Sequence, residues 1–257
     1  MCRNESTQQD AVADDWYVDA FGALYPIIYA HRTIEAAAPE ARFAALVVQL
    51  RDDDMALDLC CGAGRHLVTL RQVTRRLAGV DYSPALLALA RTRVDPSVGL
   101  VRADMRALPF FAAFDVAFSF FTSFGYFMED RDNFQSARCM ARALKPGGRF
   151  FLDYLNPKMV ARSLQAETER ASQGYVIHEQ RWIDAEAQRV NKRVTVTQDN
   201  RPLGVFMESV RLYAHGEMTD MLVRAGLRVE QSFGDYDGAA YASDSPRMLL
   251  VGVKDAP

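Results

Sequence analysis

A short apolar segment that runs into closely spaced glycines limits how this chain can fold. Met55 to Leu59 is followed by the turn Cys60-Cys61-Gly62-Ala63-Gly64. Because glycine permits backbone angles closed to other residues, the chain can turn sharply after a strand and lay a helix, predicted over 65–76, beside it. Asp81 comes 17 residues after Gly64, at the end of a second apolar segment, near the roughly 20 expected for a carboxylate that binds ribose hydroxyls. The pattern predicts a site for an adenosine-containing cofactor.

The turn lacks the marks of phosphate-binding loops. A dinucleotide fingerprint needs a third glycine where this chain has Leu67, and the Gly-Lys-Ser/Thr of a triphosphate-binding loop does not occur. A phosphate-free adenosine cofactor fits better, with Asp58 near a cationic group and Asp81 on the ribose. The alternative interpretation is an ordinary strand–helix turn whose glycines have no binding role. Asp81 and the segments that follow make this alternative less probable.

Five segments, taken in order and including the glycine turn and Asp81, resemble the successive motifs of class I S-adenosylmethionine-dependent methyltransferases. They are residues 57–64, 79–83, 102–106, 114–119 and 144–150. The resemblance implies an α/β fold with a doubly wound, seven-stranded, mostly parallel Rossmann-like sheet whose final strand is antiparallel. It also implies S-adenosylmethionine as the cofactor and S-adenosylhomocysteine as the product.

The same resemblance assigns cofactor roles by position. It puts Asp58 and the glycine backbone against the methionine part and Asp81 on the ribose. Asp104 would then bind the adenine amine, with Met105 beside the ring. Cys60 departs from the family pattern, which usually has its first glycine there. The expected cofactor residues are Asp58, Cys60, Gly62, Gly64, Asp81, Tyr82, Asp104, Met105 and Ser119.

Strand and helix signals alternate along the chain, which requires a mostly parallel sheet with helices on both faces. Ser83-Pro84 opens a helix with a cap residue followed by proline. The other predicted helices are 34–50, 132–144 and 216–225, and the other predicted strands are 98–102, 114–120, 149–154, 227–233 and 248–253.

A different pattern occupies the region between the predicted fifth strand and the helix at 216–225. Residues 175–183, 189–197 and 204–213 alternate polar with apolar or β-branched side chains, which predicts three antiparallel strands. We expect disorder over 1–10, an N-terminal helical lid over 11–50, a methyltransferase core of 51–155 and 214–257, and a β-rich insertion over 156–213. The resemblance gives this insertion the role of a substrate cover or of a surface for homo-oligomers.

Composition narrows the class of protein. The chain has 257 residues, 49% of them hydrophobic, which is enough for a full core. Its net charge of −3, without a long basic run, gives no electrostatic footprint for nucleic acid. The four cysteines have neither metal spacing nor a disulfide framework, and no signal peptide or long apolar run occurs. We expect a cytoplasmic protein with no metal, nucleic-acid or membrane partner.

The acceptor is expected at the carboxyl ends of the strands, beside the cofactor. The segment 120–127, after the predicted fourth strand, is rich in aromatic residues and lacks the Asn/Asp-Pro-Pro-aromatic sequence of nucleic-acid amino-methyltransferases. A methyltransferase of the catechol type would need a cluster of acidic residues to bind magnesium, and only Asp153 stands out at a suitable strand end. A metal-free methyltransferase of small molecules remains.

Aromatic residues recur at helical spacing between Trp16 and Tyr29, which predicts one amphipathic helix. The spacing alone favours core packing over a functional role. The segment also resembles the aromatic entry helix of bacterial small-molecule methyltransferases, including the N-methyltransferases of lincosamide antibiotic biosynthesis. That resemblance assigns Tyr17, Tyr25 and either Phe124 or Phe121 to the reaction centre. We hypothesise that the tyrosine hydroxyls hold an amine whose lone pair attacks the methyl group.

Several polar residues leave the acceptor atom open. The expected substrate residues are Tyr29, Arg32, Phe121, Asp153, Arg181 and Tyr213. N-methylation of a small molecule is the first interpretation. O-methylation is the second and needs a base such as His66, His31 or Asp153 to take a hydroxyl proton. A non-catalytic cofactor-binding subunit is the third.

Overall fold

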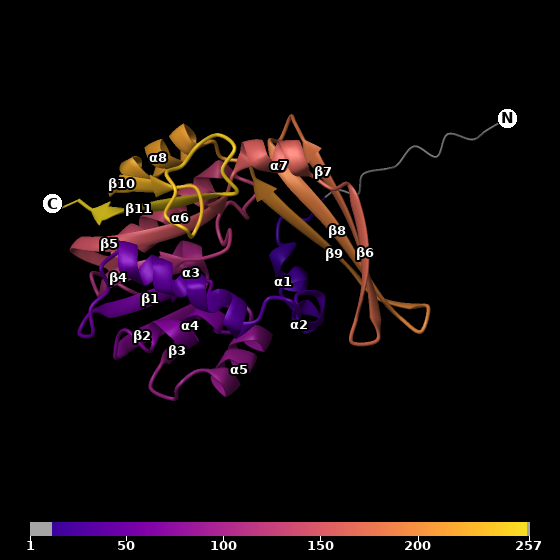
Figure 1. The fold of residues 1–257 in the computed structure, drawn as a ribbon, viewed down its shortest axis with the longest axis horizontal. Helices are drawn as coiled ribbons and strands as arrows, with labels where there is room; N and C mark the ends of the chain where they lie inside the picture. The colour runs from indigo at the N-terminus through magenta and orange to yellow at the C-terminus, as the bar shows by residue number, and fades with distance from the viewer. Residues whose placement is uncertain (1–11, 256–257) are drawn as a thin grey trace.

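Seven strands form the central sheet of the computed structural model, which describes residues 12–255 (Figure 1). In chain order they are β1 (Met55–Leu59), β2 (Arg76–Asp81), β3 (Gly99–Arg102), β4 (Phe114–Ser119), β5 (Leu144–Leu155), β10 (Leu227–Phe233) and β11 (Arg247–Lys254). Their spatial order is β10-β11-β5-β4-β1-β2-β3. Only β11 runs antiparallel to its neighbours, β5 and β10. The predicted sheet is therefore confirmed, while the disorder predicted for 1–10 lies outside the described residues.

Helices cover both faces of this sheet. The helices α3 (Ile34–Val47), α4 (Arg65–Leu70) and α5 (Pro84–Arg93) lie on one face, and α6 (Asp130–Ala143) and α8 (His215–Arg224) lie on the other. Successive strand residues point to opposite faces, so Ala56 packs under α3 and α4 whereas Leu57 packs on the side of α6. Two apolar cores result, one on each side of the sheet.

The sequence predicts the start of α5 correctly but not the end of α4. The Ser83 hydroxyl accepts a hydrogen bond from the Leu86 N–H at 3.2 Å and caps α5 as predicted. The helix predicted over 65–76 instead ends at Leu70. The Thr74 hydroxyl donates to the Asp54 carbonyl at 2.6 Å, which ties the chain to the start of β1 and turns it into β2. The prediction of helix beyond Leu70 was wrong for this reason.

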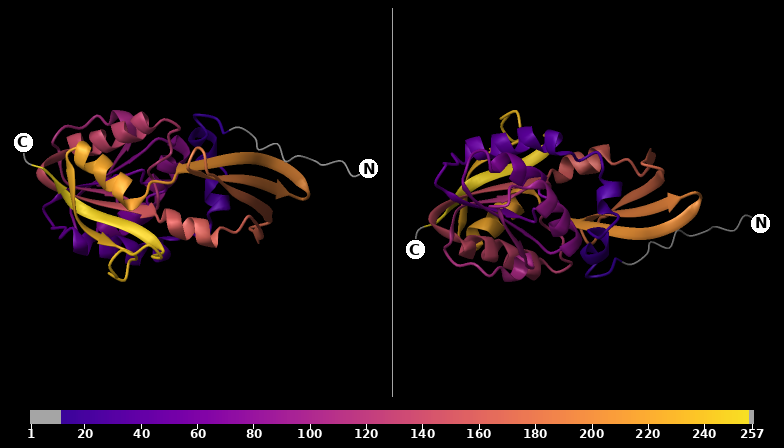
Figure 2. Two further views of the ribbon diagram at one scale, coloured as in Figure 1. Left: turned by 90° about the horizontal axis from the view of Figure 1, so that it is seen from above. Right: turned by 90° about the horizontal axis from the view of Figure 1, so that it is seen from below.

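A second, antiparallel sheet follows β5 and the short helix α7 (Pro157–Ser163). Its strands, in spatial order, are β6 (Glu167–Ser172), β7 (Tyr175–Asp184), β8 (Arg189–Gln198) and β9 (Arg201–Arg211). The antiparallel insertion is confirmed, but it has four strands and not three. The missed strand, β6, has almost no apolar residues, because it is an edge strand paired only with β7. Figure 2 shows the second sheet projecting from the seven-stranded core.

The aromatic N-terminal segment is not the single helix that its spacing predicts. It forms two one-turn helices, α1 (Tyr17–Ala20) and α2 (Tyr25–Ile28). Pro26 has no N–H to donate to the carbonyl of Gly22, so the first helix cannot continue through this point. Both turns lie between the two sheets (Figure 1), with Ile28 buried on the second sheet against Ile177. Within residues 12–255, no helix is both long and apolar enough to cross a membrane.

Candidate active site

A cavity of about 770 Å³ opens at the carboxyl ends of the parallel strands. Its floor comes from the ends of β1, β2 and β4, one wall comes from α1 and α2, and the second sheet contributes a further side. This volume is within the range of sites that hold drug-sized ligands. The cavity lies where open α/β sheets bind their ligands, as the sequence predicts.

The glycine turn after β1 forms one end of the cavity. Gly64 has φ +78°, and a Cβ there would lie 2.8 Å from Val94 Cγ1, so only glycine fits against α5. Gly62 has φ +54° with open space around it and lines the cavity. Cys60 also has a positive φ of 58°, a geometry that strains a residue with a side chain. Cys60 thus has a backbone angle typical of glycine at the position where the resembled motif usually has its first glycine.

Two buried carboxylates stand beside this turn. Asp81 Oδ2 accepts the Gly62 N–H and Oδ1 accepts the Ser83 N–H, both at 2.8 Å. Burial raises the pKa of Asp81 while these backbone hydrogen bonds oppose the rise. Asp58 is 1% exposed, and its Oδ2 has no hydrogen-bond partner among residues 12–255. A buried oxygen left without a partner, next to an open glycine turn, fits a cofactor that brings its own donors.

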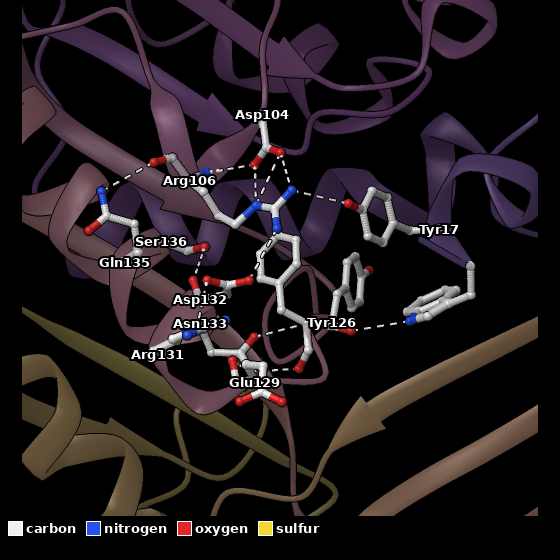
Figure 3. A network of polar contacts seen from close by, with 12 residues as sticks. Tyr17, Asp104, Arg106, Tyr126, Glu129, Arg131, Asp132, Asn133, Gln135 and Ser136 are labelled. Carbon is white, nitrogen blue, oxygen red and sulfur yellow. Dashed lines mark hydrogen bonds and ion pairs between the residues drawn. The ribbon is translucent and has the colours of Figure 1, made fainter. Parts of the chain in front are cut away.

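The Asp104 carboxylate belongs to a polar network that reaches the N-terminal segment (Figure 3). Arg106 Nη2 donates to Asp104 at 2.6 Å and to the Tyr17 hydroxyl at 3.2 Å, and Arg106 Nη1 donates to Asp132 at 3.3 Å. Burial raises the pKa of Asp104, but the hydrogen bonds from Arg106 outweigh it and the net shift is downward. Asp104 is therefore held ionised, as an acceptor for an amine requires.

Aromatic rings form the wall opposite the glycine turn. Tyr17 packs edge-on against Phe127 with ring centroids 5.6 Å apart, and Tyr25 lies 4.6 Å from Tyr29. The Tyr25 hydroxyl accepts a hydrogen bond from Arg32 at 3.1 Å. The Tyr29 hydroxyl donates to Glu208 on β9. Tyr17 and Tyr25 both line the cavity, and the hydroxyl of each accepts a hydrogen bond from an arginine.

Most of the predicted residues meet in this cavity. Those that line it are Tyr17, Tyr25, Tyr29, Arg32, Cys60, Gly62, Asp81, Tyr82, Asp104, Met105, Phe121 and Arg181. Asp58 and Gly64 do not line the cavity: Asp58 is buried in β1 before the turn, and Gly64 packs against Val94. Arg65, Tyr126, Glu208 and Arg247 also line it and were missed by the sequence analysis.

Four predicted residues lie away from the cavity. Phe124 is buried in the core with its ring 6.3 Å from that of Tyr213, so Phe121 is the aromatic residue of this loop that reaches the cavity. Ser119 faces a small void beside Phe124, because alternate residues of β4 point to opposite sides. The Tyr213 hydroxyl donates to Asp130 at 2.5 Å. These positions correct the expected contacts of Phe124, Ser119 and Tyr213.

Asp153, the fourth of these, is fully buried under the cavity. Its carboxylate accepts hydrogen bonds from the Phe121 N–H at 2.6 Å, from the Tyr236 hydroxyl at 2.7 Å and from Arg247 Nε at 2.7 Å. It therefore supports two residues that line the cavity, Phe121 and Arg247, and does not line the cavity itself. The backbone that the Asp153 carboxylate bonds is that of the loop after β4, and not that of the turn after its own strand.

A buried arginine from the second sheet holds the aromatic loop. Arg189 on β8 is 3% exposed and donates to the carbonyls of Phe127 at 2.9 Å, Tyr126 at 3.0 Å and Gly125 at 3.2 Å. Its Nε donates to the Ser209 hydroxyl at 2.7 Å. Sequence gives no signal for this role, since an arginine in an alternating strand is ordinarily exposed.

The site is that of an α/β enzyme with a nucleoside-containing cofactor, because a glycine turn and an acidic strand end lie beside the cavity. Comparison with known proteins shows the family. A family model described as a methyltransferase domain matches residues 56–148. The cypemycin N-terminal methyltransferase of a Streptomyces species is 31% identical over 241 residues, which are 88% of this chain and 97% of that protein. The chain belongs to the S-adenosylmethionine-dependent methyltransferases.

Two further matches cover nearly the whole chain. The dTDP-4-amino-2,3,4,6-tetradeoxy-D-glucose N,N-dimethyltransferase of Saccharopolyspora spinosa is 27% identical over 247 residues, 90% of this chain and 92% of that protein. The X-ray structure of the sugar N-methyltransferase KedS8 from Streptoalloteichus superposes with a TM-score of 0.72 at 22% identity, covering 99% and 98% of the two chains. The predicted family and fold are confirmed.

Proposed function

We propose that this methyltransferase transfers a methyl group from S-adenosylmethionine to an amine nitrogen of a small molecule and releases S-adenosylhomocysteine. The observation that carries the proposal is a cavity walled by aromatic rings and phenol hydroxyls whose candidate bases are engaged elsewhere. Two relatives that match along most of the chain are named as an N-terminal methyltransferase and an N,N-dimethyltransferase. Both names agree with an amine acceptor.

The bound cofactor supplies an activated methyl group on a cationic sulfur. The residues of this chain then need mainly to align the acceptor and exclude water, and such positioning supplies up to about 7 to 11 kcal/mol. The free lone pairs on the Tyr17 and Tyr25 oxygens accept N–H groups of the amine and point its own lone pair toward the methyl group. Aromatic faces favour the positive charge at sulfur and then at nitrogen by about 0.5 to 2 kcal/mol each.

O-methylation is less well supported because the candidate bases are occupied. His66 is 4% exposed, its Nε2 lies 2.7 Å from Glu40 Oε2, and burial lowers its pKa to about 4. Asp153 is committed to Arg247 and Tyr236. His31 is exposed and does not line the cavity, although Ala30 and Arg32 on either side of it do. Each of these three candidate bases is therefore either bonded to another residue or absent from the lining of the cavity.

The second sheet is proposed to cover the acceptor. Arg181 on β7, and Glu208 and Val210 on β9, line the cavity from the side that faces away from the glycine turn. Because Tyr29 is bonded to Glu208, the cover and the N-terminal segment meet at the cavity. A cover of this kind would exclude water from the methyl-transfer site.

Methyl-labelled S-adenosylmethionine offered with matched amines and alcohols tests the proposal. We expect label on nitrogen, with a pH dependence of kcat/KM that follows the pKa of each amine and is kept in the His66→Gln variant. Label found only on oxygen, or a rate that requires one histidine or aspartate of the enzyme, would reject N-methylation. Binding of S-adenosylhomocysteine by calorimetry without any methyl transfer would favour the non-catalytic alternative.

A further inference from the structure

Charged side chains form a row across the inner face of the second sheet, which is the face that packs on the N-terminal segment. The strand register places Arg181 on β7 beside Lys192 on β8, and Lys192 beside Glu208 on β9. Residues paired across antiparallel strands point to the same face, and this face also carries Ile177, which packs on Ile28. The row therefore faces the rest of the molecule and not solvent.

The next row of the same face, toward the seven-stranded sheet, is apolar. It is formed by Ile183, Val190 and Val210. Val190 and Val210 pack against the apolar core beside α6. Buried ion pairs contribute little to stability compared with well-packed apolar side chains. Stability alone therefore does not account for a charged row at this level of the sheet.

The arginines of this face are taken up by a buried carboxylate. Glu179 is 4% exposed and accepts hydrogen bonds from Arg170 Nη1 at 2.6 Å and from Arg181 Nη2 at 2.5 Å. Arg181 Nη1 also donates to the Thr168 hydroxyl at 3.0 Å. Burial raises the pKa of Glu179, but the cations of Lys192 and of the two arginines outweigh it, and the net shift is downward. Arg181 lines the cavity, yet both of its Nη groups are bonded within the second sheet.

Glu208 is the carboxylate of the row that lines the cavity. Lys192 Nζ lies 2.7 Å from its Oε2, and the Tyr29 hydroxyl donates to its Oε1. Burial and the Glu208 carboxylate raise the pKa of Tyr29 well above its usual value, so the phenol keeps its proton and remains the donor. A carboxylate has about four lone-pair sites. Each oxygen of Glu208 therefore keeps a site with which it can accept a hydrogen bond from a ligand.

The other carboxylates that line the cavity, among residues 12–255, are placed differently. Asp81 accepts two backbone N–H groups beside the glycine turn, and Asp104 is bonded to Arg106. Glu35 is exposed in the first turn of α3. Glu208 is thus the cavity carboxylate on the side of the second sheet, which is the side proposed to cover the acceptor.

We propose that Glu208 is the ammonium-binding residue of the acceptor site and accepts an N–H of the protonated amine. Aliphatic amines are protonated at neutral pH, as the lysine side chain is. The N–H that protonation adds is bound by Glu208, whereas Tyr17 and Tyr25 accept those of the free amine. A hydrogen bond between charged partners is roughly twice as strong as one between neutral groups. The inference rests on the proposed function for the amine acceptor and adds the residue that selects it.

Calorimetric titration of the S-adenosylhomocysteine-loaded protein tests this site without requiring turnover. The probes are benzylamine, which is protonated at neutral pH, and benzyl alcohol, which is neutral and has nearly the same shape. We expect the wild type to bind benzylamine about 10- to 100-fold more tightly than benzyl alcohol. Glu208→Gln should remove this preference and leave the Kd values of benzyl alcohol and S-adenosylhomocysteine unchanged. A preference that persists in Glu208→Gln, or is absent from the wild type, would overturn the proposal.

The controls separate this site from folding and from the acceptor atom. Glu169→Gln removes an exposed carboxylate from the opposite face of the second sheet and should change none of the titrations. Glu208→Asp keeps the charge on a shorter side chain and should reduce the preference by a smaller factor, which decides the matter if Glu208→Gln does not fold. Methyl label found only on oxygen would reject N-methylation and leave these binding results as they are. Label on nitrogen with an unchanged preference in Glu208→Gln would reject the ammonium site alone.

Discussion

The Arg106 guanidinium lies 3.2 Å from the Tyr17 hydroxyl and donates a hydrogen bond to it. The same guanidinium donates to Asp104 at 2.6 Å. Tyr17 belongs to the N-terminal segment, whereas Asp104 lies after β3 at the end of the cavity assigned to the adenine. Arg106 therefore links the aromatic wall around the acceptor to the carboxylate expected to bind the cofactor (Figure 3).

This link predicts non-additive effects of two substitutions on turnover. Tyr17→Phe should lower kcat about 2- to 10-fold through loss of one hydrogen bond to a positioned group. Arg106→Met removes the donor of that bond and also the bonds to Asp104 and Asp132, so it should lower kcat at least as much. Because both changes break the same contact, the double variant should show a coupling energy of about 0.5 to 1.5 kcal/mol. Arg102→Met, which removes an arginine bonded to the Tyr82 carbonyl, should combine additively with Tyr17→Phe. Additivity in both cycles would contradict the link.

The two glycines of the turn should respond differently to a methyl group. Both have a positive φ, so alanine is strained at either position by about 1 to 3 kcal/mol. At Gly64 the added Cβ would also lie 2.8 Å from Val94 Cγ1, whereas at Gly62 the nearest atom is 4.0 Å away. We expect Gly64→Ala to lower the free energy of unfolding by about 1 to 3 kcal/mol more than Gly62→Ala. Chemical denaturation measures this difference, and equal losses would show that packing against α5 is not limiting.

The turn and its acidic partner could be predicted because their signals are local. Gly62 and Gly64 have positive φ angles, which glycine adopts without help from residues elsewhere in the chain. The spacing between Gly64 and Asp81 follows from the length of one strand–helix–strand unit. The seven-stranded sheet followed from the alternation of strand and helix signals. The end of α4 did not follow, because it depends on the contact of Thr74 with the chain before β1.

The aromatic loop shows why the rest could not be predicted. Phe121 and Thr122 both have positive φ, at 56° and 63°, which reverses the loop and turns Phe121 into the cavity while Phe124 enters the core. Non-glycine residues rarely adopt these angles, so no pattern in 120–127 indicates them.

His66 should make stability depend on pH in a defined window. Burial lowers its pKa from 6.5 to about 4, so between these values the unfolded chain binds a proton that the folded chain does not. Stability contributed by neutral His66 is thus present above about pH 6.5 and is lost as the pH falls toward 4, by up to about 1.4 kcal/mol per pH unit. His66→Gln should flatten the pH dependence of the unfolding free energy in this range. A wild-type slope in His66→Gln would assign the pH dependence to another group.

Arg189 is expected to be the residue through which the second sheet sets the shape of the cavity. Arg189→Met removes one of the two donors of each carbonyl of Gly125, Tyr126 and Phe127, so we expect a loss of about 1 to 3 kcal/mol in the free energy of unfolding. Tyr126 and Phe127 line the cavity, so the KM of the acceptor should rise even where the protein is fully folded.

A lysine variant of Arg189 distinguishes the effect of the positive charge from the effect of the several N–H donors of the guanidinium. Arg189→Lys keeps the positive charge but cannot reach three carbonyls and Ser209 at once, so its stability and its KM should fall between those of the wild type and Arg189→Met. Arg201→Met, on the exposed edge strand β9, should alter neither quantity. If Arg189→Met lost stability while the KM of the acceptor stayed at the wild-type value, the loop would keep its position without the arginine, and the second sheet would act on the cavity only through the residues that line it.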